Sequence, residues 1–158
     1  MVTMMGLGDY LTVDGVFANL HARCKREALS HLAKAAGDLT GVSTQTIEEA
    51  LFERERLGST GVGHGVAIPH GKIAGLEEIV ALFAKLDAPI GFDAVDDEPV
   101  DLIFLLLAPE DATAAHLKAL AKVSRLLRDD SVREALRGAD TAEALFAITT
   151  ETTRSDAA

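Results

Sequence analysis

The chain has 158 residues, of which 48% are apolar and only 4% aromatic, and it carries a formal net charge of −10. This length predicts a single domain, over residues 1–150, with a sizeable core. The composition favours helices packed on a sheet over an all-β sandwich. The negative charge argues against nucleic acid as a direct partner, because phosphate backbones would repel it.

Cysteine usage and hydropathy narrow the class further. Cys24 is the only cysteine, which excludes an internal disulfide and a thiolate metal cluster, and we expect it to be a small buried residue. No apolar run reaches the roughly 18–20 residues that span a bilayer, and no signal peptide is recognisable. We therefore expect a cytoplasmic protein without membrane insertion, whose first residue is Met1, Met4 or Met5.

The first predicted elements are a short strand over 15–21 and a helix over 25–37. Gly37 stands where such a helix usually ends. A second helix is predicted over 43–57, with Ser43 or Thr46 as its cap and Gly58 beyond its end. Its inward stripe is expected to contain Ile47, Ala50, Leu51 and Leu57.

Arg54 falls on that same stripe. Burying an arginine on an apolar face is costly unless it meets an anion or a carboxylate. A salt bridge to one of the many acids and a role in ligand binding both remain open for it.

Residues 61–71 read Gly-Val-Gly-His-Gly-Val-Ala-Ile-Pro-His-Gly. Alternate glycines permit sharp turns or the close approach of a ligand, and 66–68 predict a buried strand piece that Pro69 ends. His70 is thus delivered at a strand end, where a histidine is more often part of a site than of a core. The run is no P-loop, because it precedes a strand and lacks the Lys-Ser/Thr pair.

Residues 78–86 and 100–108 predict two more strands, joined by a turn-rich connection over 87–99 that has room for an edge strand. A strong helix follows over 111–128, and its inward face is expected to carry His116 and Leu117 near its start. A lone inward histidine is often a satisfied core residue. The position of His116 beside a strand end keeps a role in a site equally open.

The C-terminal part predicts shorter helices over 131–137 and 141–148, and a frayed tail over 151–158. Strands alternating with helices predict an α/β fold, a sheet flanked by helices on both faces.

Two histidines and an arginine suggest the handling of a phosphoryl group. The imidazole of His70 is nucleophilic near neutral pH, and Arg54 and His116 would neutralise the phosphoryl oxygens. No cofactor is needed. The spacing of His64 and His70 fits no compact metal site, so no metal is expected, and no Gly-x-Ser-x-Gly elbow indicates a hydrolase.

The other histidines and the acidic cluster are not expected to take part in the chemistry. His21 and His31 are expected to be structural or solvated, and His64 a flexible-loop bystander. The acidic group of Asp93, Asp96, Asp97 and Glu98 predicts a solvated turn or part of a partner surface.

The segment from Glu55 to Gly71, with Val62-Gly63 and Val66-Ala67-Ile68-Pro69-His70-Gly71, resembles the histidine signature of type-2 enzyme IIA domains of the bacterial phosphoenolpyruvate-dependent phosphotransferase system. Further blocks, 54–61, 89–96, 99–104 and 116–117, are similar to the nitrogen-regulatory subgroup. The resemblance covers about residues 11–150.

This resemblance implies a mixed β-sheet of about five strands sandwiched between helices. It implies phosphorylation of His70 on Nε2, with Arg54 and His116 flanking the phosphate. The donor would be an HPr-like phosphohistidine carrier. His64 departs from the asparagine expected at its position, and its effect is open.

Three functions follow as hypotheses. The first is a regulatory phosphocarrier that signals nitrogen, carbon or ion status through phosphorylation-dependent partner binding. The second is a sugar-specific enzyme IIA that passes phosphate to an enzyme IIB, and the third is a docking module with a vestigial histidine.

Overall fold

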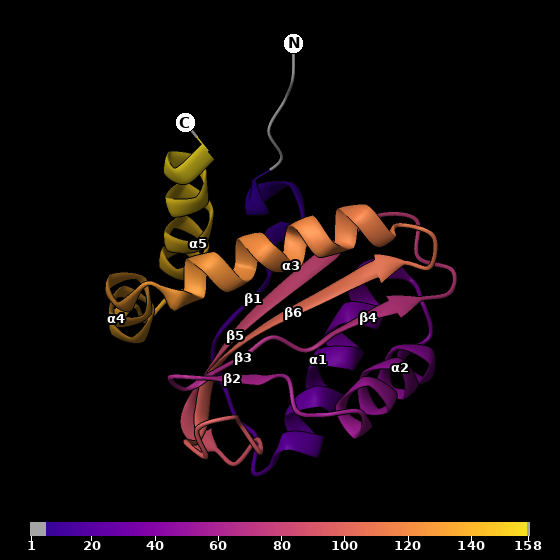
Figure 1. The fold of residues 1–158 in the computed structure, drawn as a ribbon, viewed down its shortest axis with the longest axis horizontal. Helices are drawn as coiled ribbons and strands as arrows, with labels where there is room; N and C mark the ends of the chain where they lie inside the picture. The colour runs from indigo at the N-terminus through magenta and orange to yellow at the C-terminus, as the bar shows by residue number, and fades with distance from the viewer. Residues whose placement is uncertain (1–5, 158) are drawn as a thin grey trace.

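The computed structural model describes residues 6–157, and the side chains of residues 6–151. A six-stranded sheet lies between two groups of helices, with α1 and α2 on one face and α3, α4 and α5 on the other (Figure 1). The α/β sandwich expected from the sequence is confirmed, although the sheet has one strand more than the five expected. The alternative start sites lie outside the described residues.

The strands pair in the order β1-β5-β6-β3-β2, and β4 also pairs with β6. In chain order they are β1 Leu11–Leu20, β2 Gly61–Gly63, β3 Val66–Ala67, β4 His70–Ile73, β5 Val80–Ile90 and β6 Val100–Pro109. β6 runs antiparallel to β5 and parallel to β3 and β4, so the sheet is mixed. Ile90 pairs with Val100, which shows that the edge strand allowed for in 87–99 is in fact the end of β5.

The helices predicted over 43–57, 111–128 and 131–137 begin and end within two residues of their predicted bounds, whereas those predicted over 25–37 and 141–148 end later. The helices of the structure are η1 Leu7–Asp9, α1 Lys25–Thr40, α2 Thr44–Arg56, α3 Thr113–Arg128, α4 Asp130–Gly138 and α5 Ala142–Ala157. Ser43 caps α2 as predicted, since its side chain accepts a hydrogen bond from the Thr46 backbone N–H.

α1 corrects two expectations. It continues past Gly37 to Thr40 and ends at Gly41, whose φ of 79° is the left-handed conformation that favours glycine. Gly37 instead marks a close packing point, because a Cβ there would lie 2.7 Å from the Thr44 hydroxyl oxygen. Cys24 at the N-cap position is exposed rather than buried.

α5 continues to Ala157, so most of the segment predicted as a frayed tail is helical in the structure. Near its middle, the hydroxyls of Thr149 and Thr150 donate to backbone carbonyls one turn earlier. Among the described residues, no helix is long and apolar enough to cross a bilayer.

Two apolar cores fill the space on either side of the sheet. One joins α1 and α2 to the sheet, and the other joins η1, α3, α4 and α5 to the opposite face. β6 is shared by both cores, and its residues Leu102–Ala108 are fully buried, as the continuous apolar run predicted. The central strand is therefore a rigid support for whatever lies along its edge.

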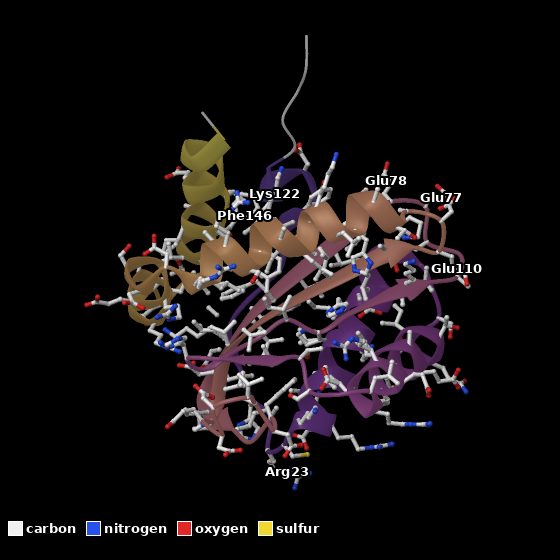
Figure 2. All side chains as sticks on the ribbon, viewed as in Figure 1. Arg23, Glu77, Glu78, Glu110, Lys122 and Phe146 are labelled. Carbon is white, nitrogen blue, oxygen red and sulfur yellow. The ribbon has the colours of Figure 1, made fainter. Side chains whose placement is uncertain are left out.

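Carboxylates gather at the end of the sheet where β4 and β6 finish (Figure 2). Glu77 and Glu78 lie in the connection to β5, and Glu110 follows β6 directly. His70 stands at the start of β4, so this acidic end lies beyond the far end of its strand.

Candidate active site

His70 is the first residue of β4, at a place where the edge of the sheet is interrupted. β3 and β4 both pair with β6, but the two residues between them leave the regular ladder. The Ile68 N–H turns away and donates to the Thr60 carbonyl, while the Pro69 carbonyl accepts from the Leu106 N–H. Because β4 lies at this edge, His70 can be reached by α2 from one layer and α3 from the other.

The hydrogen bonds of the His70 ring define its tautomer. Nδ1 lies 2.9 Å from the Ile68 carbonyl oxygen, which can only accept, so the neutral ring carries its proton on Nδ1. Nε2 then holds the lone pair, toward which the Arg54 Nε–H donates at 3.3 Å. The nucleophilic atom of the ring therefore faces a cation.

Burial keeps this ring neutral. It lowers the pKa of His70 below the ordinary 6.5, and the Arg54 guanidinium lowers it further, whereas the Ile68 carbonyl and the Glu55 carboxylate act in the opposite direction. At neutral pH the lone pair on Nε2 is consequently present in most molecules.

The contacts of Arg54 contradict the salt-bridge interpretation. Its Nη1 donates to the Gly58 carbonyl at 2.8 Å and its Nε to His70. No carboxylate of a described residue forms a salt bridge with it. The guanidinium charge thus remains uncompensated beside Nε2, an arrangement that favours an anion there.

His116 is buried as predicted, with 6% of its surface exposed. Its ring centroid lies 5.6 Å from that of His70, in an edge-on arrangement. Burial, then the neighbouring His70 and Lys72, lower its pKa. Its buried Nε2 has no hydrogen-bond partner among the described residues, which is a costly arrangement unless a ligand supplies the partner.

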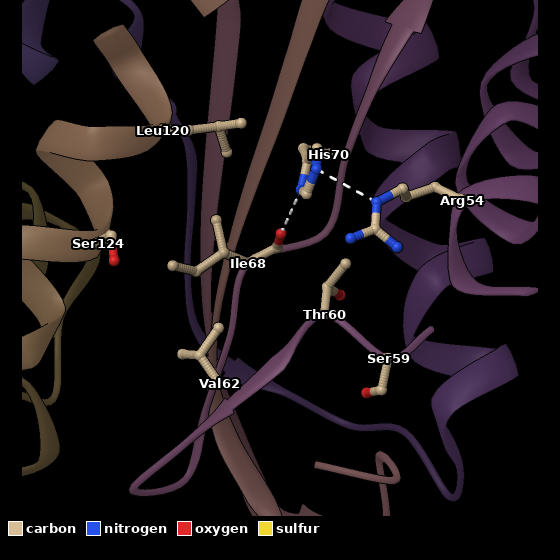
Figure 3. Close-up of a pocket in the computed structure, with 8 residues that line it drawn as sticks. All are labelled: Arg54, Ser59, Thr60, Val62, Ile68, His70, Leu120 and Ser124. Carbon is tan, nitrogen blue, oxygen red and sulfur yellow. Dashed lines mark hydrogen bonds between the residues drawn. The ribbon is translucent and has the colours of Figure 1, made fainter. Parts of the chain in front are cut away.

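A cavity of about 230 Å³ opens in front of His70 (Figure 3). Its polar side is formed by α2 and the turn after it, and the opposite side by β2, the residue after β3, and α3. The lining residues are Arg54, Ser59, Thr60, Val62, Ile68, His70, Leu120 and Ser124. The structure thus brings two of the three predicted site residues onto one cavity wall, with His116 packed against His70.

Several of these lining residues were not predicted from the sequence. Ser59 and Thr60 stand in the glycine-bounded turn before Gly61, and Leu120 lies one helical turn after His116. Position relative to the predicted site residues was the available signal, since their residue types alone indicate nothing.

The prediction that Leu57 and Leu117 lie on the inward faces of their helices is wrong. Leu57 is 80% exposed and Leu117 is 62% exposed, although helix phase placed both inward. Leu57 is already the C-cap of α2, where the helical phase ends. Leu117 is turned by about 100° from buried His116, enough to leave the core.

The alternate glycines shape the β2–β3 hairpin rather than provide space for a ligand. A Cβ at Gly61 would lie 2.8 Å from the Ala94 Cβ, and one at Gly65 would lie 2.4 Å from an Arg137 nitrogen. Gly65 also has a φ of +76°. These glycines are therefore required by close packing and by the turn.

His64, at the tip of this hairpin, does not line the cavity. It adopts a left-handed φ of 58°, its N–H donates to Asp96, and its carbonyl accepts from Arg137. The acidic turn thus fastens the hairpin through Asp96, a role that the sequence did not indicate.

Among the side chains that the structure describes, residues 6–151, no group of three histidine, cysteine or acidic residues is placed to hold a metal ion. Residues 9–151 match the family model described as phosphoenolpyruvate-dependent sugar phosphotransferase system, EIIA 2. The chain belongs to this enzyme IIA family.

The relatives of this enzyme IIA chain have names more specific than the family description. The chain is 48% identical to a nitrogen regulatory protein of Bradyrhizobium diazoefficiens, over 91% of this chain and 94% of the relative. It is 40% identical to a nitrogen regulatory protein of Escherichia coli, over 95% and 93%. The crystal structure of the nitrogen regulatory protein IIA-Ntr from Neisseria meningitidis superposes with a TM-score of 0.87 at 38% identity, covering 91% of this chain and 99% of that one. The resemblance drawn from the sequence is confirmed.

Proposed function

We propose that this enzyme IIA chain is a regulatory phosphocarrier, which accepts a phosphoryl group on Nε2 of His70 from an HPr-like phosphohistidine carrier. One observation carries the proposal. The His70 lone pair meets the uncompensated Arg54 cation at the mouth of a cavity, with the unpartnered Nε2 of His116 close by. These groups fit the charge distribution of a phosphoryl group in transfer.

The transfer step follows from the tautomer. The Nε2 lone pair of His70 forms a bond to phosphorus while the nitrogen–phosphorus bond of the donor breaks, and its electron pair returns to the donor's imidazole. His70 keeps the proton on Nδ1, held by the Ile68 carbonyl, so its ring becomes cationic. The Arg54 N–H that now points at Nε2 is then released to a phosphoryl oxygen.

The surface around the cavity suits a protein donor. Val62 is exposed and lines it from β2, Leu120 lines it from α3, and Leu117 on the same helix is exposed. Exposed apolar side chains around a reactive group are typical of a docking site. Phosphorylation would add a charge of roughly −1.5 to −2 to this surface and so change which partner binds it.

The regulatory role is proposed because the named relatives are nitrogen regulatory proteins, and this chain matches them over nearly their whole length. The sugar-specific alternative has support from a fructose-specific component of Bacillus subtilis, but at 30% identity and over 23% of that protein. A docking module without phosphorylation would leave the half-buried Arg54 charge and the buried His116 nitrogen without a ligand that compensates them.

The test is incubation with phosphoenolpyruvate, enzyme I and the HPr-like carrier. We expect the wild type and the exposed-histidine control His31→Ala to gain one acid-labile phosphate, and His70→Ala to gain none. A wild type that stays unlabelled, or a His70→Ala variant labelled as well as wild type, would overturn the proposal. Phosphate passed on to a sugar in a permease extract would favour the sugar-specific alternative.

A further inference from the structure

A buried carboxylate lies one residue from Arg54 and has no role in the proposed transfer. The Glu55 side chain is 7% exposed, and Lys25 at the start of α1 pairs with it at 2.7 Å. A buried ion pair contributes little net stability by itself, because desolvation offsets the attraction.

Its other contacts lead to the turn that follows α2. The backbone N–H of Thr60 donates to both Glu55 oxygens, at 3.3 and 3.2 Å, and the Thr60 hydroxyl donates to Oε1. Thr60 is itself buried, with 4% of its surface exposed. Glu55 therefore fixes both donors of one residue in the wall of the His70 cavity.

From Thr60 the hydrogen bonds continue to the reactive ring. The Thr60 carbonyl accepts from the Ile68 N–H at 3.0 Å, and the Ile68 carbonyl accepts from His70 Nδ1 at 2.9 Å. Thr60 and Ile68 each donate with the backbone N–H to one neighbour and accept with the carbonyl from the next. The Lys25–Glu55 pair is thus connected to Nδ1 of His70 by an unbroken series of contacts.

We propose that Glu55 is a positioning residue for His70: acting through Thr60 and Ile68, it fixes the Nδ1–H tautomer and the ring orientation that present Nε2 to the phosphoryl group. The inference rests on the proposed function for its purpose, since only a nucleophilic Nε2 needs this tautomer. Glu55 touches no reacting atom.

Electrostatics support the same assignment. On His70 the Glu55 carboxylate opposes Arg54, since it raises the pKa that burial and the guanidinium lower. Two other titratable groups lie nearby: His116 on α3 is in ring contact with His70, and Lys72 on β4 acts on the pKa of His116. A negative charge near a ring that becomes cationic on phosphorylation stabilises the product.

The deciding measurement is NMR titration of the His70 ring in the unphosphorylated protein, together with the initial rate of phosphoryl transfer. In Glu55→Gln we expect the pKa of His70 to fall, the Nδ1–H form to lose population, and the rate to drop about tenfold or more. Glu53→Gln is the matched control, because Glu53 lies on the same helix, is 63% exposed and pairs only at the surface with Arg56. We expect it to behave as wild type.

Thr60→Val tests the same link without changing charge. It keeps the size of the side chain and the backbone N–H but loses the hydroxyl, so we expect a few-fold lower rate and a mixed tautomer, both restored in Thr60→Ser. This pair also decides the matter if Glu55→Gln fails to fold.

An unchanged His70 tautomer and pKa in both Glu55→Gln and Thr60→Val would overturn the inference. The ring measurements need no phosphate donor. A wild type that takes up no phosphate would therefore defeat the proposed function, while the titration would still report on the positioning.

Discussion

The two walls of the His70 cavity are built differently. On the α2 wall nearly every polar group is engaged: Arg54 is held by Gly58 and His70, and Glu55 by Lys25 and Thr60. On α3, the helix that lines the other wall with Leu120 and Ser124, His116 keeps an unpartnered buried Nε2 and Leu117 is exposed.

The difference indicates that the two walls have different roles in binding. A wall whose hydrogen bonds are already made is pre-organised, so it spends little free energy on ordering when a ligand arrives. A wall with an unpartnered nitrogen and an exposed leucine gains its contacts only when a phosphoryl group and a partner are present. On the proposed function, the α2 wall would position the acceptor, and α3 would receive the incoming group.

The largest expected effect comes from breaking the pre-organised wall. Arg54→Lys keeps the charge but loses the planar guanidinium that reaches both Gly58 and His70. We expect the phosphoryl-transfer rate to fall about 100-fold, with thermal unfolding little changed. Arg56→Lys, exposed on the same helix, is the control, and equal rates in the two variants would show that the fixed geometry is unimportant.

An intermediate effect is expected on the α3 wall, with opposite signs for stability and function. His116→Leu removes a buried nitrogen that has no partner in the described structure, so we expect the free energy of unfolding to rise by about 1 kcal/mol. Phosphoryl transfer should fall about tenfold or more, because a group that stabilises the transferring phosphoryl is lost. Urea unfolding and rate assays measure both, with the exposed His31→Leu as control. A less stable variant with unchanged transfer would make His116 an ordinary core residue.

The smallest effect is a shift along the pH axis. The pKa values of His70 and His116 both lie below 6.5 in the folded protein. Phosphoryl acceptance should therefore persist as the pH falls through 6.5, and be lost only below the folded pKa of His70, where protonation removes the lone pair.

The same shifts affect stability. Below pH 6.5 the unfolded chain takes up protons that the folded chain does not, so the free energy of unfolding should decrease on acidification until the folded pKa values are passed. Transfer rates and urea unfolding measured from about pH 8 to about pH 5 test this. A midpoint for transfer at or above 6.5 would contradict it.

Much of the fold was predictable because its signals are local. The apolar run of β6 and the Ser43 cap each depend on residues close in sequence, and each was found. The predictions failed where distant segments meet. Gly37 lies inside α1, where the neighbouring Thr44 leaves no room for a Cβ, and 87–90 join β5 because Ile90 pairs with Val100.

For the site, the sequence by itself selected the candidate side chains: His70 at a strand boundary set by Pro69, and Arg54 and His116 by helix phase. Only the tertiary structure decided how they are used. The pairing of β3 and β4 with one edge of β6 turns the Ile68 carbonyl toward Nδ1, and so leaves the lone pair on Nε2. The contacts of Glu55 with Thr60, and the missing partner of His116, likewise arise between helices and turns that meet only in the folded chain. No periodicity in the sequence encodes a hydrogen bond between such segments.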